Sequence, residues 1–289
     1  MSELSIAVPD VLGDVPDAVE RLFAVIHTLS SDGQITLDLT LVNWIRPYAA
    51  VSLLQACRYL KQLTRYPVHL TGLQSNIHAY LRRIDFFQRE AEVVYTSVPF
   101  NSADDLARST SSSNVLELFP IRIHEDIYEV ATRARHILAY WLSSSSYDID
   151  NIVTLLSEAC SNIVDHSGDA GIVIIQKYDR GYYVDINLAI GDLGMGIRRS
   201  LMVVHGAVSD TCAGYIELAL AGLSARSGER GGQGLGAIRR IATESGGCLY
   251  IRSEMGSVLA EASGIVTRDD LCFFPGTQIA ITFRSKRAI

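Results

Sequence analysis

Residues 155–167 read LLSEACSNIVDHS, and the interpretation of the whole chain starts from this stretch. Glu158, Asn162 and His166 follow one another at intervals of four residues, which places them on one face of a helix. The amide oxygen of Asn162 is a hard ligand that can hold Mg²⁺. Glu158 has the chemistry to orient and deprotonate a water for attack on a γ-phosphate. Taken alone, the motif is also explained by a solvent-exposed polar stripe.

A second motif, IGDLGMGI, covers residues 190–197 and directly follows a predicted strand. Asp192 stands at the strand end, where a buried carboxylate can accept a hydrogen bond from an exocyclic amine. Gly194 and Gly196 allow a ligand to approach the backbone closely. The alternative interpretation of this motif by itself is a simple turn.

The third motif, GERGGQGLGAI, covers residues 228–238 and leads into a predicted helix. Its glycines form a loop whose N–H groups can turn toward phosphate oxygens, and the helix N-terminus adds its positive end. No Gly-Lys-Ser/Thr follows, so the loop is not a P-loop. It is not a Rossmann fingerprint either, because no βαβ unit with an acidic residue surrounds it.

The fourth motif, PGTQIAITF, covers residues 275–283 and opens a terminal strand with Gly-Thr. The hydroxyl of Thr277 has the reach to contact an adenine edge or its bridging water. Without the other motifs, a turn would be the preferred interpretation.

Together the four motifs resemble, in order, the N, G1, G2 and final Gly-Thr boxes of the GHKL superfamily, which groups gyrase, Hsp90, histidine kinases and MutL. The resemblance runs from about Ile121 to Phe283. It implies a Bergerat fold, a two-layer α/β sandwich with a mixed sheet covered by helices on one face, and it implies ATP and Mg²⁺ as cofactors. By matching position, Asn162 resembles the Mg²⁺ ligand, Glu158 the catalytic base and Asp192 the adenine-binding carboxylate.

The resemblance assigns nucleotide binding to residues of all four motifs. They are Asn162, Asp165, His166, Asp192, Gly194, Met195, Gly196, Arg230, Gly231, Gly232, Gln233, Gly234, Leu235, Gly236 and Thr277. The segment between Gly196 and Gly231 would be a lid of two short helices that closes over the nucleotide. Arg226 and Arg230, near its end, contact either the γ-phosphate or solvent.

An N-terminal unit shows strand–helix–strand–helix order, which predicts a small α/β layer. Its elements are expected at residues 35–39, 48–63, 68–73 and 75–87, with Ser75 as N-cap of the last helix. This order is similar to the STAS domain of anti-sigma-factor antagonists. Arg46-Pro47-Tyr48-Ala49 replaces the family's Asp-Ser-Ser-Gly, so the phosphoacceptor serine is absent, although Ser52 lies nearby. A structural or partner-docking role is expected.

The fold class expected for the whole chain is α+β. We predict a STAS-like domain over residues 1–96, a Ser-rich linker over 97–118 and the ATP-binding domain over 119–289. In the last of these, a helix layer should cover a largely antiparallel sheet. Helices are expected at 124–142 and at 150–165, and Asp148 or Asp150 is expected to cap the second. Strands are expected at 171–178, 182–190, 247–253 and 277–283. The first two strands should be joined by a hairpin turn at 179–181.

Composition limits the classes of partner and compartment. The net charge of −7 gives no reason to expect a nucleic-acid-binding surface. The five cysteines are scattered without CxxC spacing, so neither a zinc site nor a disulfide framework is predicted. No signal peptide or apolar run of membrane-spanning length is present. We therefore expect a cytoplasmic protein with a protein partner and possible homodimerisation.

Several functions are compatible with such a domain. The first is nucleotide-dependent control or phosphorylation of a protein partner, as in the anti-sigma-factor serine-kinase branch. The second is an ATP-hydrolysing switch that dimerises, with the STAS-like unit as scaffold. A sensor histidine kinase is a third, since His124-Glu125 has a superficial likeness to a phosphoacceptor box. The fourth is a degenerate domain that binds nothing, which the set of Asn162, Asp192 and glycines argues against.

Overall fold

The computed structural model describes residues 3–9, 11–12, 16–29, 33–99, 115–142, 146–225 and 234–286. The chain divides into two compact units, Met1–Leu118 and Phe119–Ile289. The division falls at the end of the segment that the sequence predicts as a linker. Residues 100–114 of that segment lie outside the described residues, and its last four residues belong to a strand, β7 (Val115–Ile121).

The first unit contains a four-stranded parallel sheet in the order β1-β3-β5-β6 and a two-stranded parallel sheet of β2 and β4. Its elements are β1 (Glu3–Ala7), β2 (Val11–Leu12), α1 (Pro16–His27), β3 (Gln34–Asp38), β4 (Trp44–Ile45), α2 (Pro47–Thr64), β5 (Val68–Thr71), α3 (Ser75–Arg83), α4 (Phe86–Arg89) and β6 (Val94–Thr96). Helix α2 contacts both β3 and β5. Parallel pairing with crossover helices follows from the strand–helix–strand order of the sequence.

The ends of α2 are set by local sequence. Pro47 occupies the first turn, where its missing N–H costs no hydrogen bond. Arg65 adopts a left-handed conformation (φ 69°) after the last turn, and its N–H donates to the carbonyl of Lys61. Between these ends Ser52 is fully buried, with 0% of its surface exposed. Ser52 is therefore not available as a substitute for the missing phosphoacceptor serine.

The helix expected over residues 75–87 is two helices, α3 and α4. Asp85 adopts φ 61°, which interrupts the helical path between them. The predicted cap of α3 is also wrong. Gln74 is the N-cap and makes no side-chain cap bond, whereas Ser75 is the first helical residue.

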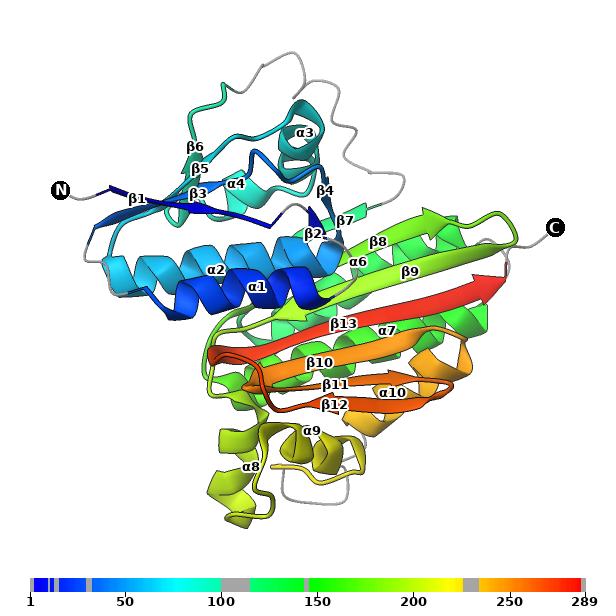
Figure 1. Cartoon of the computed structure of the whole chain (residues 1–289). Coiled ribbons are helices and arrows are strands. Elements are labelled where there is room, and N and C mark those ends of the chain that lie inside the picture. Colours follow the sequence, from blue (N-terminus) through cyan, green and yellow to red (C-terminus); the bar gives the residue numbers. More distant parts are fainter. Residues whose placement is uncertain are drawn as a thin grey trace. The chain divides into compact units, whose positions relative to one another are not determined.

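The second unit is built on a seven-stranded sheet in the order β12-β11-β10-β13-β9-β8-β7 (Figure 1). Its further strands are β8 (Gly171–Asp179), β9 (Tyr183–Gly191), β10 (Cys248–Glu254), β11 (Gly256–Glu261), β12 (Gly264–Arg268) and β13 (Phe274–Lys286). Every pairing from β8 across to β12 is antiparallel. The strand at the chain's C-terminal end thus lies in the middle of the sheet, between β9 and β10.

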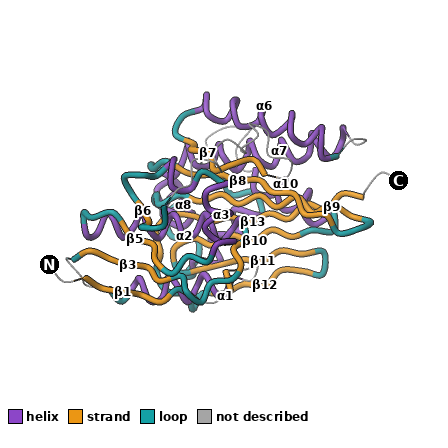
Figure 2. Tube along the Cα trace, turned by 90° about the horizontal axis from the view of Figure 1, so that it is seen from above, coloured by secondary structure: helices purple, strands orange, loops and turns teal. Residues whose placement is uncertain are grey.

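Helices α6, α7 and α10 cover one face of this sheet (Figures 1 and 2). The helices of the unit are α6 (His124–Trp141), α7 (Ser146–Asn162), the π-helical turn η1 (Ile163–Ser167), α8 (Gly196–His205), α9 (Cys212–Leu220) and α10 (Gly234–Glu244). In α7 the buried residues recur at helical spacing from Ile149 to Cys160, which gives the helix one apolar stripe. Helix α7 contacts β9 and lies between α6 and α10 in the contact network.

The start of α7 differs from the prediction. The helix begins at Ser146, so Asp148 and Asp150 both lie inside it and neither caps it. The carboxylate of Asp148 instead accepts a hydrogen bond from the hydroxyl of Ser285. The expected α+β class is confirmed, with a parallel sheet in the first unit and an antiparallel one in the second. Within the described parts of the chain, no helix combines the length and apolarity that a bilayer crossing requires.

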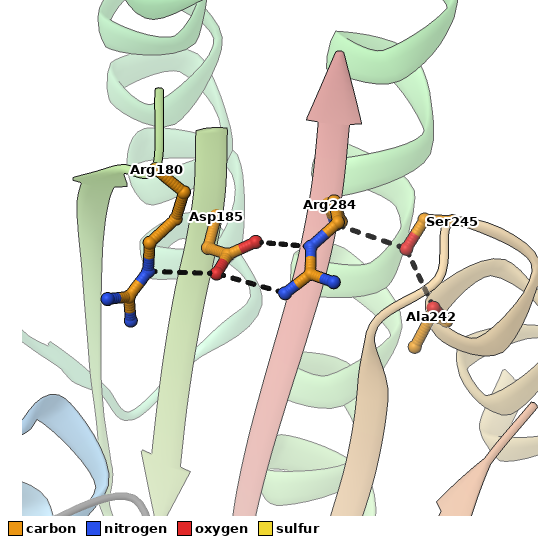
Figure 3. A network of polar contacts seen from close by, with 5 residues as sticks. All are labelled: Arg180, Asp185, Ala242, Ser245 and Arg284. Atoms are coloured by element: carbon orange, nitrogen blue, oxygen red, sulfur yellow. Dashed lines mark hydrogen bonds and ion pairs between the residues drawn. The ribbon is translucent and has the colours of Figure 1, made fainter. Parts of the chain in front are cut away.

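A buried carboxylate ties together the strands at one end of the second sheet (Figure 3). Asp185, of which 4% is exposed, accepts hydrogen bonds from Arg180 Nε at 3.2 Å and from Arg284 Nε at 2.8 Å. Arg284 N–H also donates to Ser245 Oγ at 3.2 Å, and this hydroxyl donates to the carbonyl of Ala242 in α10. The network connects the β8–β9 turn, β9, β13 and the end of α10.

We expect Asp185→Asn to lower the free energy of unfolding by about 1–2 kcal/mol, because it removes the charge that two arginines share. Urea denaturation measures this change. Asp179→Asn is the matched control, since Asp179 is an exposed acid of the same hairpin that pairs with Lys177 at 3.5 Å. Equal stability losses in the two variants would show that the network does not hold the sheet end.

Candidate functional site

The helix that carries the first motif ends in a π-helical turn. Helix α7 stops at Asn162, and η1 continues from Ile163 until Gly168, which adopts φ 74°. Single π-turns occur frequently at functional sites. Asn162, His166 and Ser167, which lie at and beyond this transition, line a cavity of the second unit. The change in helix type therefore coincides with the wall of the cavity.

The cavity gathers residues from all four sequence motifs. Eight predicted site residues line it: Glu158, Asn162, His166, Asp192, Gly196, Gly234, Leu235 and Thr277. They come from α7, η1, the end of β9, the starts of α8 and α10, and β13. Segments separated by more than a hundred residues thus meet around one space.

Four predicted residues lie beside the cavity and do not line it. Asp165 turns toward His124, at 3.3 Å, and Ser161, at 3.1 Å. Met195 is exposed. Gly194 packs against Ser167, and Gly236 faces the carbonyl of Leu220 in α9. Arg230, Gly231, Gly232 and Gln233, with Arg226, lie outside the described residues.

Other lining residues are absent from the predicted set. They are mostly apolar or small: Ala159, Ile163, Ser167, Ile190, Ile197, Ser200, Leu201, Ala219, Leu223, Ser224, Ala225 and Ile279. In the sequence these apolar positions have the same periodicity as core positions, so no pattern separates cavity wall from core. Ser200 and Ser224 give no signal beyond a polar residue in a predicted lid.

Asp192 is a buried carboxylate at the end of β9. Only 4% of it is exposed, and its Oδ1 accepts a hydrogen bond from Gly194 N–H at 2.8 Å. Burial raises the pKa of Asp192 to about 7, against the lowering effect of that hydrogen bond, and the charge of Asp169 adds to the rise. A carboxylate kept at this pKa at a cavity wall is a candidate functional group.

The backbone of Asp192 is fixed to β13. Its N–H donates to the carbonyl of Thr277 at 3.0 Å, and its carbonyl accepts from Gln278 Nε2 at 3.1 Å. A Cβ on Gly276 would lie 2.1 Å from that carbonyl, and Gly276 also adopts φ 77°. Only glycine fits there, so the Gly-Thr of the fourth motif allows β13 to pass close to Asp192.

Gly194 likewise allows a close backbone contact, here between the turn after β9 and η1. A Cβ at this position would lie 2.0 Å from the carbonyl oxygen of Ser167, which accepts a hydrogen bond from Met195 N–H at 2.9 Å. The turn after β9 therefore lies directly against the π-helical turn. This contact fixes the distance between the first and second motifs.

Glu158 lies against the N-terminus of α10. A Cβ on Gly234 would lie 2.6 Å from Glu158 Oε2, so the carboxylate occupies the space that a side chain would take. The positive end of a helix favours a carboxylate or a phosphate at this place. On the same wall Asn162 Nδ2 is buried and has no hydrogen-bond partner among the described residues. Such a donor is available to a ligand.

Helices α8 and α9 lie in the segment that the sequence predicts as a lid, and they share a small core. Leu201, Tyr215 and Ala219 are buried together, and Leu235 at the start of α10 packs against them. His205 Nε2 contacts the carbonyl of Ser224 at 2.7 Å, which connects the end of α8 to the segment after α9. Two short helices do occur in the described part of the segment between Gly196 and Gly231, and the second of them ends at Leu220.

The lid is also tethered to the sheet. Ser253 Oγ in β10 accepts a hydrogen bond from Ile197 N–H at 2.9 Å and donates to the carbonyl of Gly276 at 3.1 Å. The carboxylate of Asp269 accepts from Ala213 N–H, in the first turn of α9, at 2.7 Å. Each lid helix thus has its first turn fixed to the strand side of the unit.

The raised pKa of Asp192 makes a prediction about stability. In an unfolded chain this carboxyl titrates near its ordinary value of 3.8, so between pH 4 and 7 the folded state binds more protons. The ionised carboxylate therefore costs stability above pH 7, and the cost disappears as pH falls through 7 toward 4. We expect Asp192→Asn to be more stable than the wild type at pH 8 by about 1–3 kcal/mol.

Thermal unfolding of both proteins from pH 5 to pH 8 measures the difference. The gap between variant and wild type should narrow as the pH falls. A gap that stays constant across this range would contradict the assignment of the titration to Asp192.

No protein-family model matches the chain. A search of curated proteins likewise finds no match. Among solved structures, the chain is similar to the histidine kinase domain from the Erythrobacter litoralis EL346 blue-light activated histidine kinase, with a TM-score of 0.25 and 10% sequence identity over 92% of this chain and 92% of that chain. A similarity this low carries no argument about fold or function.

Proposed function

We propose that the second unit binds ATP and Mg²⁺ in the cavity around Asp192, and that the chain is a regulatory protein of the histidine-kinase-like ATPase type. In this proposal the nucleotide controls a protein partner or supplies the phosphoryl group for one. The observation that carries the proposal is a buried carboxylate, Asp192, in the same cavity as a helix N-terminus, at Gly234. The carboxylate suits an exocyclic amine, and the helix N-terminus suits phosphates.

The remaining lining residues are consistent with an adenine nucleotide. Ile163, Ile190 and Ile279 give the cavity apolar surface near Asp192, which suits a planar base. Asp192 would accept the hydrogen bond of the amine, and the hydroxyl of Thr277 lies in the same lining. The phosphates would then extend toward Gly234 at the start of α10.

Asn162 is the residue that would hold Mg²⁺, through its amide oxygen. Bound there, the ion would neutralise phosphate charge and orient the terminal phosphate. The place of Asn162 in the lining of the cavity that also holds Asp192 and Gly234 supports this assignment. Within the same parts of the chain, no cluster of three His, Cys, Asp or Glu side chains offers an alternative metal site.

Glu158 is the candidate general base. Its carboxylate lies against the α10 N-terminus, where it would accept a proton from a water or from a partner's hydroxyl. Release of phosphate to water is the second candidate function, an ATP-hydrolysing switch, and the same contact between Glu158 and Gly234 favours it. Because the side chain of Ser52 is buried, it does not offer a phosphorylation site for this control.

Isothermal titration calorimetry of the full chain with ATP and Mg²⁺ tests the binding site. We expect Asp192→Asn to weaken binding by at least roughly 10- to 100-fold, because it removes a charge-assisted hydrogen bond in a buried site. Asp185→Asn, the same substitution outside the cavity, should bind as the wild type does. Unchanged affinity in Asp192→Asn would overturn the adenine assignment.

The pH dependence of the same titration gives an independent check. The ionised form of Asp192 accepts the hydrogen bond, so wild-type affinity should fall as the pH drops through 7, approaching tenfold for each pH unit below it. Asp192→Asn should lose this dependence.

Glu158→Ala should leave ATP binding intact and stop turnover. Incubation with γ-labelled ATP, with and without a native cell extract, measures both possible products. Free phosphate without a labelled protein would favour hydrolysis, and a labelled protein would favour a kinase. Full activity in Glu158→Ala would exclude Glu158 as the base.

A further inference from the structure

Helix α6 carries a continuous exposed stripe on the face that does not pack in its own unit. Its buried residues are Val130, Ala134, Leu138 and Trp141. The α6 stripe consists of His124, Glu125, Tyr128, Glu129, Thr132, Arg135, His136, Ala139 and Tyr140, all of them exposed. Figure 2 shows α6 outermost in the helical layer, with α7 beneath it.

Two tyrosines make this stripe unusual for a solvent-facing surface. Tyr128 is 78% exposed and Tyr140 is 75% exposed. Tyrosine combines a large apolar ring with a polar tip and is enriched at protein interfaces. Isolated exposed aromatic residues are ordinary, but two on one helical stripe mark a candidate contact surface.

The α6 stripe is symmetric about Thr132. When the helix is paired with its own copy in the antiparallel direction, with Thr132 at the centre, each position of the stripe meets another position of the stripe. Glu129 then faces position 135, and Tyr128 faces position 136. Glu125 faces position 139, and His124 faces position 140. Two-fold symmetry requires such self-complementary patches.

We propose that the α6 stripe is the docking surface for a second copy of this chain, arranged antiparallel about a two-fold axis at Thr132. Glu129 would pair with the partner's Arg135, and the reciprocal pair forms by symmetry. Thr132 at the axis and Ala139, about two turns further along α6, are small residues, which allows the two helices to approach each other. The tyrosines cover the outer parts of the contact.

The charge order along α6 favours a copy of this chain over other partners. Acidic stripe residues, Glu125 and Glu129, lie in the first half, and the basic Arg135 lies in the second half with His136. A partner of uniform charge would match one half and oppose the other. The helix dipole accounts for the acidic residues of the first turn, such as Glu125, but Glu129 and Arg135 lie in the interior of α6, beyond its terminal turns.

Arg135 is held in place for this contact. Its Nη1 donates to Asp150 Oδ1 of α7 at 2.6 Å, and 55% of its side chain remains exposed. The guanidinium has five donors, so one pair with Asp150 leaves others for a second carboxylate. Asp150 is therefore a positioning residue for the proposed interface.

The size of the stripe sets the strength of the dimer. From His124 to Tyr140 the helix extends about 24 Å. One pair of helices of this length buries less than the roughly 1,200–2,000 Å² of a stable complex. The dimer should therefore form and dissociate with protein concentration.

Sedimentation equilibrium of the full chain without nucleotide tests the proposal. The wild type should pass from monomer to dimer within the range up to about 1 mM. Thr132→Arg places like charges at the axis, and Glu129→Lys opposes Arg135, so each should raise the dissociation constant at least roughly tenfold. Glu244→Lys, on the exposed end of α10, is a control that keeps the stripe and should leave the dimer formed.

A mixing experiment tests the register. Glu129→Lys and Arg135→Glu should each be monomeric alone, whereas their equimolar mixture should form a heterodimer with both charge pairs restored. Circular dichroism confirms that each variant is folded. A monomeric wild type at 1 mM, a dimer unaffected by Thr132→Arg, or a mixture that stays monomeric would each overturn the proposal.

Discussion

The second unit keeps one carboxylate, Asp192, out of water at the end of a central strand, and residues of all four motifs surround the cavity that it lines. Burial of a charge is costly unless hydrogen bonds compensate it. Gly194 N–H supplies one bond to the carboxylate, and Asp192 is part of the cavity wall. The pKa near 7 shows that the compensation is incomplete. A ligand with a suitable hydrogen-bond donor would compensate the buried charge of Asp192 more fully. The free energy that burial of this carboxylate costs the fold would then favour binding of the proposed ligand.

Close backbone contacts hold the motifs at fixed distances around this carboxylate. Gly276 brings β13 against the carbonyl of Asp192, and Gly194 brings the turn after β9 against η1. Gly234 leaves room for the Glu158 carboxylate at the start of α10. Each glycine is therefore required by a different close contact at its own position. In combination they explain why four motifs distant in sequence surround one cavity.

The sequence predicted the α+β class, the main strands and the two lid helices, because alternation and helical spacing report directly on buried faces. It did not predict the π-helical turn at Ile163–Ser167, where Ser167 packs against the turn at Gly194 from a distant part of the sequence. The break between α3 and α4 was also missed, since it follows from the backbone conformation of Asp85. The sequence misplaced helix ends where a side chain makes a tertiary contact and not a local cap. The carboxylate of Asp148, for example, accepts a hydrogen bond from Ser285 and does not cap α7.

The sequence predicted the polar residues of the candidate site but not its apolar wall, for a physical reason. Polar residues with a specific geometry, such as Glu158, Asn162 and Asp192, stand out against an apolar helix or strand. The apolar wall of the cavity does not, because Ile190 and Ile279 obey the same alternation as core residues. The lid adds a further constraint that only the structure reveals. Its core includes Leu235, the residue after Gly234, so a displacement of α8 and α9 would disturb the α10 N-terminus as well. Access to the cavity and the placement of the proposed phosphate site are therefore coupled through one cluster of side chains.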